Sequence, residues 1–272
     1  MIESMLLGLL QGLAEFLPVS SSGHLVLGKT LFNMHDVGMF FDIMLHVGTL
    51  FSIFVVFHKK IWNILYGIFK KEEAQIKEAL FIVIASVPTA FIGLFFKDTL
   101  ENLFVNPKAV CVGLLFTGVL LFLTRWSAPS AEKPMRVKPM NWWRAFLTGV
   151  MQGVACIPGI SRSGSTTSVM LYLGIDRKYA GEFTFLMSIP AVAGAALLDL
   201  KKWISCQGAD ALLDVCKDSG NFSLALILGM IVSFISGIFA LKWLMAFVKK
   251  GKLHYFSWYV FAVGVLGLIF LK

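Results

Sequence analysis

Two short stretches of this chain place groups that could bind an anion and transfer protons inside an otherwise apolar sequence. Residues 11–24 read Gln-Gly-Leu-Ala-Glu-Phe-Leu-Pro-Val-Ser-Ser-Ser-Gly-His, and residues 152–165 read Gln-Gly-Val-Ala-Cys-Ile-Pro-Gly-Ile-Ser-Arg-Ser-Gly-Ser. They align without a gap when Gln11 is placed on Gln152, and six positions are then identical. In this alignment the carboxylate, hydroxyl and imidazole of the first copy correspond to a thiol, a guanidinium and a hydroxyl in the second: Glu15 to Cys156, Ser21 to Arg162 and His24 to Ser165. We interpret the two stretches as halves of one polar site.

The carboxylate of the first stretch is Glu15. Gln11 precedes it by four residues, so the two side chains share one face of a helix. A carboxylate within a membrane segment is costly, and it usually faces a cavity, an ion or a cationic group. The alternative is a carboxylate that reaches the surface from a helix end or forms a structural ion pair with Arg162.

A serine turn follows the proline of the first stretch. Ser20, Ser21, Ser22 and Gly23 would cap a returning helix, and free amides at such an N-terminus attract anions, above all phosphate. His24 lies three residues after Ser21, so a nucleophile and a proton-transfer group could face each other. The alternative, which we prefer for Ser20 and Ser22 taken singly, is that the serines only cap the helix and the histidine bonds a carbonyl.

Arg162 is the strongest single indication of an anionic ligand. Its guanidinium is always charged, and its planar fork suits phosphate. A second helix N-terminus with further small and hydroxyl residues surrounds it: Ser161, Ser163, Gly164, Ser165 and Thr166. The competing interpretation is an internal ion pair with Glu15. Both can hold if the pair loosens when substrate arrives.

The elements that must position these groups lie in a membrane. Hydrophobic residues make up 57% of the chain, charged residues 15%, and the mean hydropathy is +0.79, far from the composition of soluble domains. The N-terminus lacks the basic start of a cleaved signal peptide. The net charge of +8 comes from Lys and Arg at the ends of apolar runs rather than in one stripe, so we expect no nucleic-acid partner.

Six apolar runs are long enough, or nearly so, to span a bilayer. They cover residues 40–57, 79–96, 109–124, 183–198, 222–241 and 255–271. The runs before Pro18 and Pro158 are too short, and we expect each to form a re-entrant helix-loop-helix pair, because irregular backbone at membrane depth must line a cavity or be buried in protein. The predicted fold is an all-α polytopic membrane protein with six transmembrane helices and two re-entrant pairs.

The repeat predicts two halves of one membrane domain. Residues 1–126 form the first, 127–140 a proline-containing cytoplasmic linker, and 141–272 the second. Three spans in each half make the second half inverted, an arrangement that places broken helices at a central site. Fifteen Lys and Arg residues lie on one side and seven on the other, so the positive-inside rule places both termini outside the cytoplasm.

Other features complete the expectations. Residues 60–78 have the helical spacing of apolar residues that is typical of an interfacial amphipathic helix. Trp142 and Trp143 are expected to anchor the chain at a membrane interface. Cys206 and Cys216 form a disulfide or stay as two free thiols. Asp42 and His46 share a helix face, but we assign neither a role.

The paired motifs at 11–24 and 158–166 resemble those of the undecaprenyl-diphosphatase family, the bacitracin-resistance type of membrane phosphatase. The resemblance implies that one phosphate is removed from the lipid undecaprenyl diphosphate, giving the monophosphate carrier for peptidoglycan, in the bacterial inner membrane and toward its outer face. It implies a divalent cation, Mg or Ca, and makes Ser21 the nucleophile, His24 the acid or base and Arg162 the phosphate clamp. Glu15 becomes the metal or proton partner, and Gln11 a second metal position that lacks a carboxylate. A homodimer is a further expectation, and transport of a phosphate-bearing lipid or anion is the alternative function.

Overall fold

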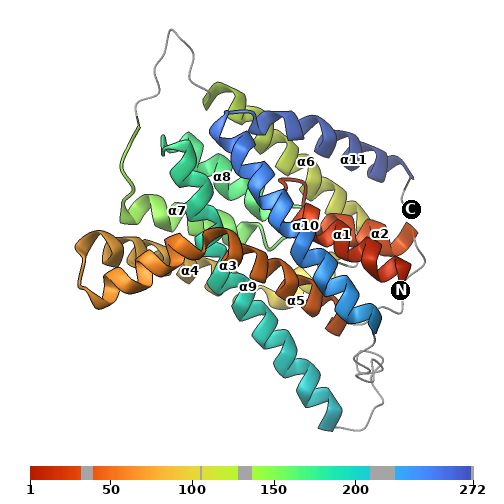
Figure 1. Cartoon of the computed structure of the whole chain (residues 1–272). Coiled ribbons are helices and arrows are strands. Elements are labelled where there is room, and N and C mark those ends of the chain that lie inside the picture. The colour runs from red at the N-terminus through yellow and green to blue at the C-terminus, as the bar shows by residue number, and fades with distance from the viewer. Residues whose placement is uncertain (32–38, 105, 128–136, 209–223, 271–272) are drawn as a thin grey trace.

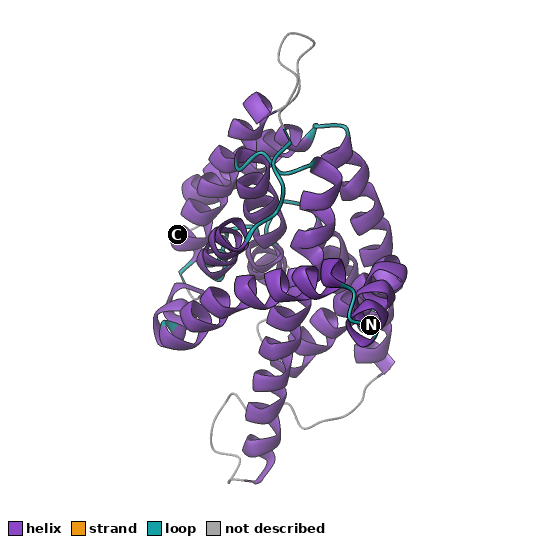
Figure 2. Cartoon of the chain, turned by 90° about the vertical axis from the view of Figure 1, so that its left-hand side faces the viewer, coloured by secondary structure: helices purple, strands orange, loops and turns teal. Residues whose placement is uncertain are grey.

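The described part of the chain folds into a bundle of helices. The computed structural model describes residues 1–31, 39–104, 106–127, 137–208 and 224–270, and within these ranges it contains helices and no strand (Figures 1 and 2). The α-helices are α1 (Ile2–Phe16), α2 (Ser21–Leu31), α3 (Met39–Phe69), α4 (Glu73–Phe95), α5 (Lys97–Phe104), α6 (Pro107–Leu123), α7 (Trp142–Val154), α8 (Arg162–Tyr172), α9 (Arg177–Gly208), α10 (Leu224–Lys249) and α11 (Phe256–Phe270). Two 3₁₀ turns, Thr124–Ser127 and Leu253–Tyr255, follow α6 and precede α11.

Six helical segments are long and apolar enough to cross a membrane, as the sequence predicted. They are Phe40–Phe69, Glu73–Phe95, Pro107–Ser127, Arg177–Leu198, Leu224–Lys249 and Leu253–Phe270. Large apolar side chains such as Phe91, Phe239 and Ile269 are exposed on their outer faces. Exposed apolar surface of this extent suits a lipid environment, so the chain is a multi-pass membrane protein.

The single helix expected at residues 60–78 is wrong in its extent, because a turn divides it between α3 and α4. α3 continues to Phe69 through a kink at Phe57, whose φ of −105° and ψ of 16° depart from helical values. A turn then leads into α4. Ile64 is 7% exposed and belongs to the core, and Ile61 packs against it. Leu65, Ile68 and Phe69 are 48%, 40% and 85% exposed, so only one side of the segment packs on the bundle.

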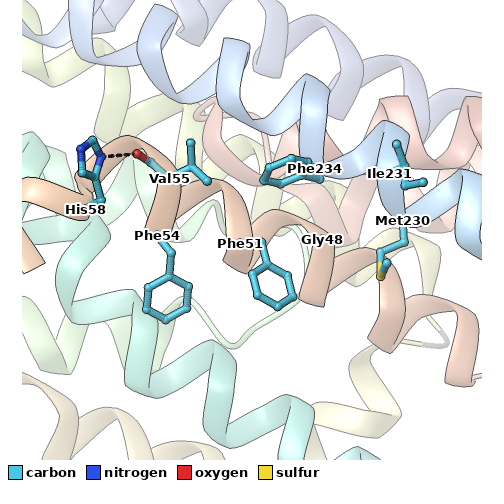
Figure 3. A pocket seen from close by; sticks show the side chains of 8 residues that line it. All are labelled: Gly48, Phe51, Phe54, Val55, His58, Met230, Ile231 and Phe234. Atoms are coloured by element: carbon cyan, nitrogen blue, oxygen red, sulfur yellow. Dashed lines mark hydrogen bonds between the residues drawn. The ribbon is translucent and has the colours of Figure 1, made fainter.

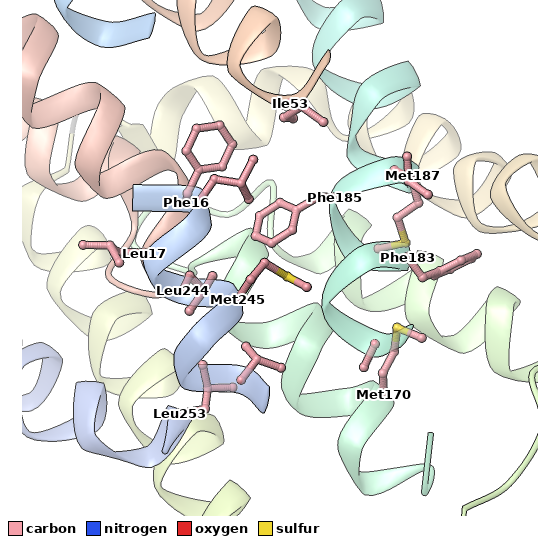
Figure 4. Close-up of a cluster of buried hydrophobic side chains, with 14 of the residues drawn as sticks. Phe16, Leu17, Ile53, Met170, Phe183, Phe185, Met187, Leu244, Met245 and Leu253 are labelled. Carbon is pink, nitrogen blue, oxygen red and sulfur yellow. The ribbon is translucent and has the colours of Figure 1, made fainter. Parts of the chain in front are cut away.

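The core fixes the end of α1. Phe185 on α9 lies 5.8 Å from the Phe16 ring in an edge-on contact and 6.0 Å from the Phe57 ring in a stacked contact. Met245 on α10 is part of the same cluster, which Figure 4 shows. Because Phe16 is the last residue of α1 and is fully buried, this packing holds the neighbouring Glu15 in place.

Close backbone contacts join each short helix to a long one. Gly8 of α1 lies against the backbone of Gly229 in α10, and Gly149 of α7 lies against the backbone of Ala85 in α4. Thr89 reinforces the second contact by donating a hydrogen bond to the Gly149 carbonyl at 3.0 Å. These contacts require glycine, because a Cβ at either position would overlap a carbonyl group of the partner helix.

Gly149→Ala is therefore expected to lower stability by about 1–3 kcal/mol, the usual cost of overpacking. The measurement is the melting temperature of the purified protein in detergent. Gly194→Ala is the matched control, since Gly194 also lies in a helix but a Cβ there would meet nothing within 4 Å. An unchanged melting temperature for Gly149→Ala would contradict the close packing of α7 on α4.

Candidate active site

Two breaks in the helical backbone position the polar residues. α1 ends at Phe16, the chain turns through Ser20 with a φ of 69°, and α2 begins at Ser21. α2 folds back along α1, since a Cβ at Gly28 would lie within 4 Å of two α1 leucines. In the second copy, Gly159 takes a φ of 86° between α7 and α8. α1, α2, α7 and α8 are not among the six candidate spans of the described residues.

The two breaks touch each other, as expected for halves of one site. The Ser163 hydroxyl donates to the Leu17 carbonyl at 3.3 Å, and the Gly159 amide donates to the Ser22 hydroxyl at 3.5 Å. Gly164 lies against Pro18, whose side chain would contact a Cβ at 2.9 Å. The two stretches singled out by their repeat therefore lie together.

Glu15 is the centre of the site. Its Oε1 accepts a hydrogen bond from the Arg162 guanidinium in a largely buried ion pair. Its Oε2 accepts from the Ser21 hydroxyl at 2.6 Å and from the Gln11 amide at 3.1 Å. The His46 Nε2 atom lies 3.9 Å from the same oxygen. The ion pair between Glu15 and Arg162, which was one of two interpretations of the sequence, is present. Through Glu15, it brings the guanidinium close to Ser21, the candidate nucleophile.

These groups face a cavity of about 500 Å³. Glu15, Ser21 and Arg162 line it together with Ser20, Ser22 and Ser161. The remaining lining residues come from α1, α3, α4, α5, α7, α9 and the second break: Ala14, Asp42, Ile43, His46, Thr89, Phe104, Gln152, Ala155, Cys156, Ile160, Ala191, Val192, Ala195 and Ala196. The cavity has polar groups at the two breaks and on α3, α4 and α7, and an apolar wall from α9 and Phe104 of α5, which suits an amphiphilic ligand.

A second hollow of about 550 Å³ differs in chemistry. It lies between α3 and α10 and is lined by Gly48, Phe51, Phe54, Val55, His58, Met230, Ile231 and Phe234 (Figure 3). No acidic side chain, lysine or arginine lines it. It therefore offers no charge to bind phosphate, and the polar cavity is the candidate site.

His24 lies beside the site but does not line the cavity. Its Nδ1 atom is 2.9 Å from the Ser20 carbonyl and its Nε2 atom is 2.7 Å from the Tyr259 hydroxyl. Since a carbonyl only accepts hydrogen bonds, Nδ1 carries the proton toward Ser20. The hydrogen bond partner of Ser21 is Glu15 rather than His24, so the pairing considered from the sequence differs from the one in the structure.

Several predicted hydroxyls hold the backbone of the breaks, and of these Ser20, Ser22 and Ser161 also line the cavity. Ser165 donates to the Ser161 carbonyl and Thr166 to the Arg162 carbonyl, each at 2.6 Å. Ser161 caps α8 by accepting from the Gly164 amide at 3.2 Å. At the first break, the Ser20 hydroxyl accepts from the Gly23 amide at 3.3 Å and lies 3.2 Å from the Ser22 hydroxyl.

The structure adds residues that the sequence left without a role. His46 donates a hydrogen bond from its Nδ1 to the Asp42 carbonyl at 2.8 Å, which leaves its Nε2 facing Glu15. Gln152 is 1% exposed and donates to Thr89 at 3.2 Å. Its Oε1 has no hydrogen-bond partner among the described residues. The four-residue spacing of Asp42 and His46 was a usable signal. Tyr259 had none, because it lies 235 residues from His24.

The comparisons with known proteins agree over nearly the whole chain. The family model described as bacitracin resistance protein BacA matches residues 4–266. A relative named undecaprenyl-diphosphatase from Alkaliphilus metalliredigens is 40% identical, and the match covers 98% of this chain and 98% of the relative. Relatives of the same name from Carboxydothermus hydrogenoformans and Bacteroides fragilis are 39% and 40% identical, and the matches cover 98% of this chain and 96% and 97% of theirs.

Proposed function

The chain belongs to the bacitracin resistance protein BacA family, and on this premise we propose that it hydrolyses undecaprenyl diphosphate to undecaprenyl phosphate and inorganic phosphate. The observation that carries the proposal is the contact of Ser21 and Arg162 with one carboxylate, Glu15, at the wall of a cavity. A nucleophile, a proton acceptor and a phosphate-binding cation are the groups that this reaction needs. The apolar walls of the cavity suit the lipid part of the substrate.

We propose that Ser21 attacks the terminal phosphorus. The Ser21 oxygen forms a bond to phosphorus, the bond to the bridging oxygen breaks, and undecaprenyl phosphate leaves. The Ser21 proton passes to Glu15, whose Oε2 already accepts it in a hydrogen bond of 2.6 Å. Water then hydrolyses the phosphoserine. The competing course, in which Ser21 only orients an attacking water, uses the same groups.

Arg162 is proposed to hold the transferring phosphoryl group. Its charge and planar fork match the equatorial oxygens of that group. In the structure it pairs with Glu15, so substrate competes with the carboxylate for the guanidinium. As Arg162 turns toward phosphate, Glu15 loses a positive neighbour and becomes a better acceptor for the Ser21 proton.

His24 is proposed to position the serine turn. Its ring joins the Ser20 carbonyl to Tyr259 on α11, and Ser20 adopts the left-handed conformation that non-glycine residues disfavour. The hydrogen bonds support this role over the acid or base role implied by the resemblance.

We propose that the site binds a divalent cation, Mg or Ca. The donor atoms present meet part of what such an ion requires. No group of three or more His, Cys, Asp or Glu side chains suited to a metal occurs among the described residues. Glu15 offers one carboxylate, and the neighbouring Gln11 has a buried Oε1 without a hydrogen-bond partner there. Mg²⁺ often takes one or two carboxylates and fills its other positions with phosphate oxygens and water. When bound, the ion would neutralise charge on the diphosphate.

We propose that α1 with α2 and α7 with α8 are re-entrant pairs of an inverted repeat. Gly8 and Gly149 occupy equivalent positions of the two copies, and each packs its helix on the second long helix of the other half. This exchange supports halves at 1–126 and 141–272, joined by a linker at 127–140 that lies largely outside the described residues. Cys216 also lies outside them, and the homodimer stays a prediction.

The proposed orientation agrees with the exposed tryptophans. Trp126 and Trp258 both contact Phe122, and Trp243 contacts Phe256, so these rings gather at one end of the bundle. Tryptophan is enriched at both membrane interfaces, so these rings mark an interface, and the lysine and arginine residues of the loops decide its side. The cavity instead takes lining residues from the first turns of α3 and from α5. We propose that the tryptophan end is cytoplasmic and that the cavity opens toward the outer face, with both termini outside.

The experiment that tests the function is phosphate release by the purified protein. Undecaprenyl diphosphate in detergent micelles is expected to yield one inorganic phosphate per lipid, because the substrate loses only its terminal phosphate. The same protein in liposomes is assayed for movement of the lipid across the bilayer. Movement of the lipid without phosphate release would show that the protein is a transporter and not a hydrolase.

A further inference from the structure

A second charged hollow lies apart from the site. It has a volume of about 570 Å³ and lies between α3 at and just after its kink, the start of α9 and the end of α10. None of its lining residues lines the polar cavity. Five lysines and one glutamate face it: Lys59, Lys60, Lys178, Lys242, Lys249 and Glu182. We name this hollow the lysine pocket.

The lysines of the pocket are only partly neutralised. Lys178 lies 3.9 Å from Glu182, and Lys60 lies 3.6 Å from Glu78. Among the described residues, the other three, Lys59, Lys242 and Lys249, form no ion pair. Like charges that converge on one hollow repel each other, and a bound anion relieves that repulsion. The electrostatics of the pocket therefore favour an anionic ligand.

The surroundings indicate that this anion is carried by a lipid. Val56, Phe57 and Met245 give the pocket an apolar part beside the lysines. Trp62 and Trp243, which are 67% and 50% exposed, lie beside it in sequence and mark the level of the membrane interface. A ligand with phosphate at this level and acyl chains below it would satisfy both parts of the pocket.

We propose that the lysine pocket binds the phosphate headgroup of an anionic phospholipid. Lysine ammonium groups bind phosphate as mobile point charges, and basic pockets between membrane helices are suited to such headgroups. The binding site is separate from Ser21 and Arg162, so it does not depend on the proposed hydrolysis. Three helices meet at the pocket, and bound lipid would join the first half of the chain to the second.

The test measures binding of cardiolipin to the purified full-length protein in detergent by native mass spectrometry. The triple variant Lys59→Gln, Lys242→Gln, Lys249→Gln is expected to raise the apparent Kd by at least about tenfold, since each basic residue contributes to binding anionic lipid. Phosphatidylcholine binding should not change. The matched control is Lys70→Gln, Lys71→Gln, Lys77→Gln, which removes the same charge from exposed lysines outside the pocket. It is expected to change the Kd by less than about twofold.

Three results would overturn the proposal. An unchanged Kd in the pocket variant would show that the lysines do not hold the headgroup. An equal rise in both triple variants would show that only total charge matters. Displacement of cardiolipin by millimolar glycerol 3-phosphate would show that the pocket takes soluble phosphate esters. The melting temperature of each variant is measured alongside, and a binding loss counts only where melting is unchanged. If the pocket variant melts early, Lys242→Gln alone is tested in the same way, with an expected Kd rise of at least about threefold.

Discussion

Replacing Arg162 with alanine is expected to lower kcat/KM for phosphate release by about 10³-fold, the usual loss when a charge-stabilising group is removed from a transition state. Arg162→Lys keeps the charge but loses the planar fork, so a smaller loss of about 10²-fold is expected. Arg162 lines the cavity and contacts Glu15. The measurement is release of inorganic phosphate from undecaprenyl diphosphate by each purified variant. Arg144→Ala, which removes a half-buried arginine at the start of α7 that does not line the cavity, is the control.

The ion pair with Glu15 allows a sharper version of this experiment. Arg162→Ala leaves a buried carboxylate without its cation, which is destabilising. Glu15→Gln in the same chain removes the stranded charge, so the double variant should regain stability. Because the double variant lacks both the proposed phosphate clamp and the proposed acceptor of the Ser21 proton, it should stay inactive although it is folded. Recovery of activity together with stability would show that the two side chains form only a structural ion pair and that the reaction needs neither of them.

The large features of the fold were predictable because they follow from local sequence. An apolar run of sufficient length specifies a span, and all six were found from such runs. The breaks near Pro18 and Pro158 were visible because proline and the following small residues interrupt those runs. The proximity of the two breaks was predicted from the sequence repeat, in which Gln11 aligns with Gln152. The structure of either helix alone does not require a glutamine there, so the repeated residue indicated a shared site.

The features that were missed depend on contacts between distant elements. Nothing local marks the kink at Phe57, which accompanies packing of that ring on Phe185 of α9. The partner of Ser21 was also misplaced. His24 is three residues away and Glu15 six, yet the turn at Ser20 directs the imidazole toward Tyr259 and the hydroxyl toward Glu15. Spacing along a helix predicted the wrong neighbour because the break lies between the carboxylate and the serine.

Ser21→Ala is expected to abolish phosphate release to within about 10³-fold of the uncatalysed background, because the variant lacks the attacking oxygen and keeps only binding and charge stabilisation. The measurement is release of inorganic phosphate, combined with acid quenching of the enzyme with substrate labelled in the terminal phosphate. Wild-type protein should retain label on Ser21, and Ser21→Ala should retain none.

Two neighbouring residues separate this chemistry from a loss of structure. Ser22→Ala removes a hydroxyl that also lines the cavity but contacts only the Gly159 amide at 3.5 Å and the Ser20 hydroxyl at 3.2 Å, and no carboxylate, so a loss of less than about tenfold is expected from two weak hydrogen bonds. His24→Gln should lower activity less than Ser21→Ala if the imidazole only positions the turn, and should leave its pH dependence unchanged. A shifted pH dependence of phosphate release in His24→Gln would show that the histidine transfers a proton in the reaction. Full activity with label absent from wild-type Ser21 would assign the attack to water, because an orienting hydroxyl leaves no phosphate on the protein.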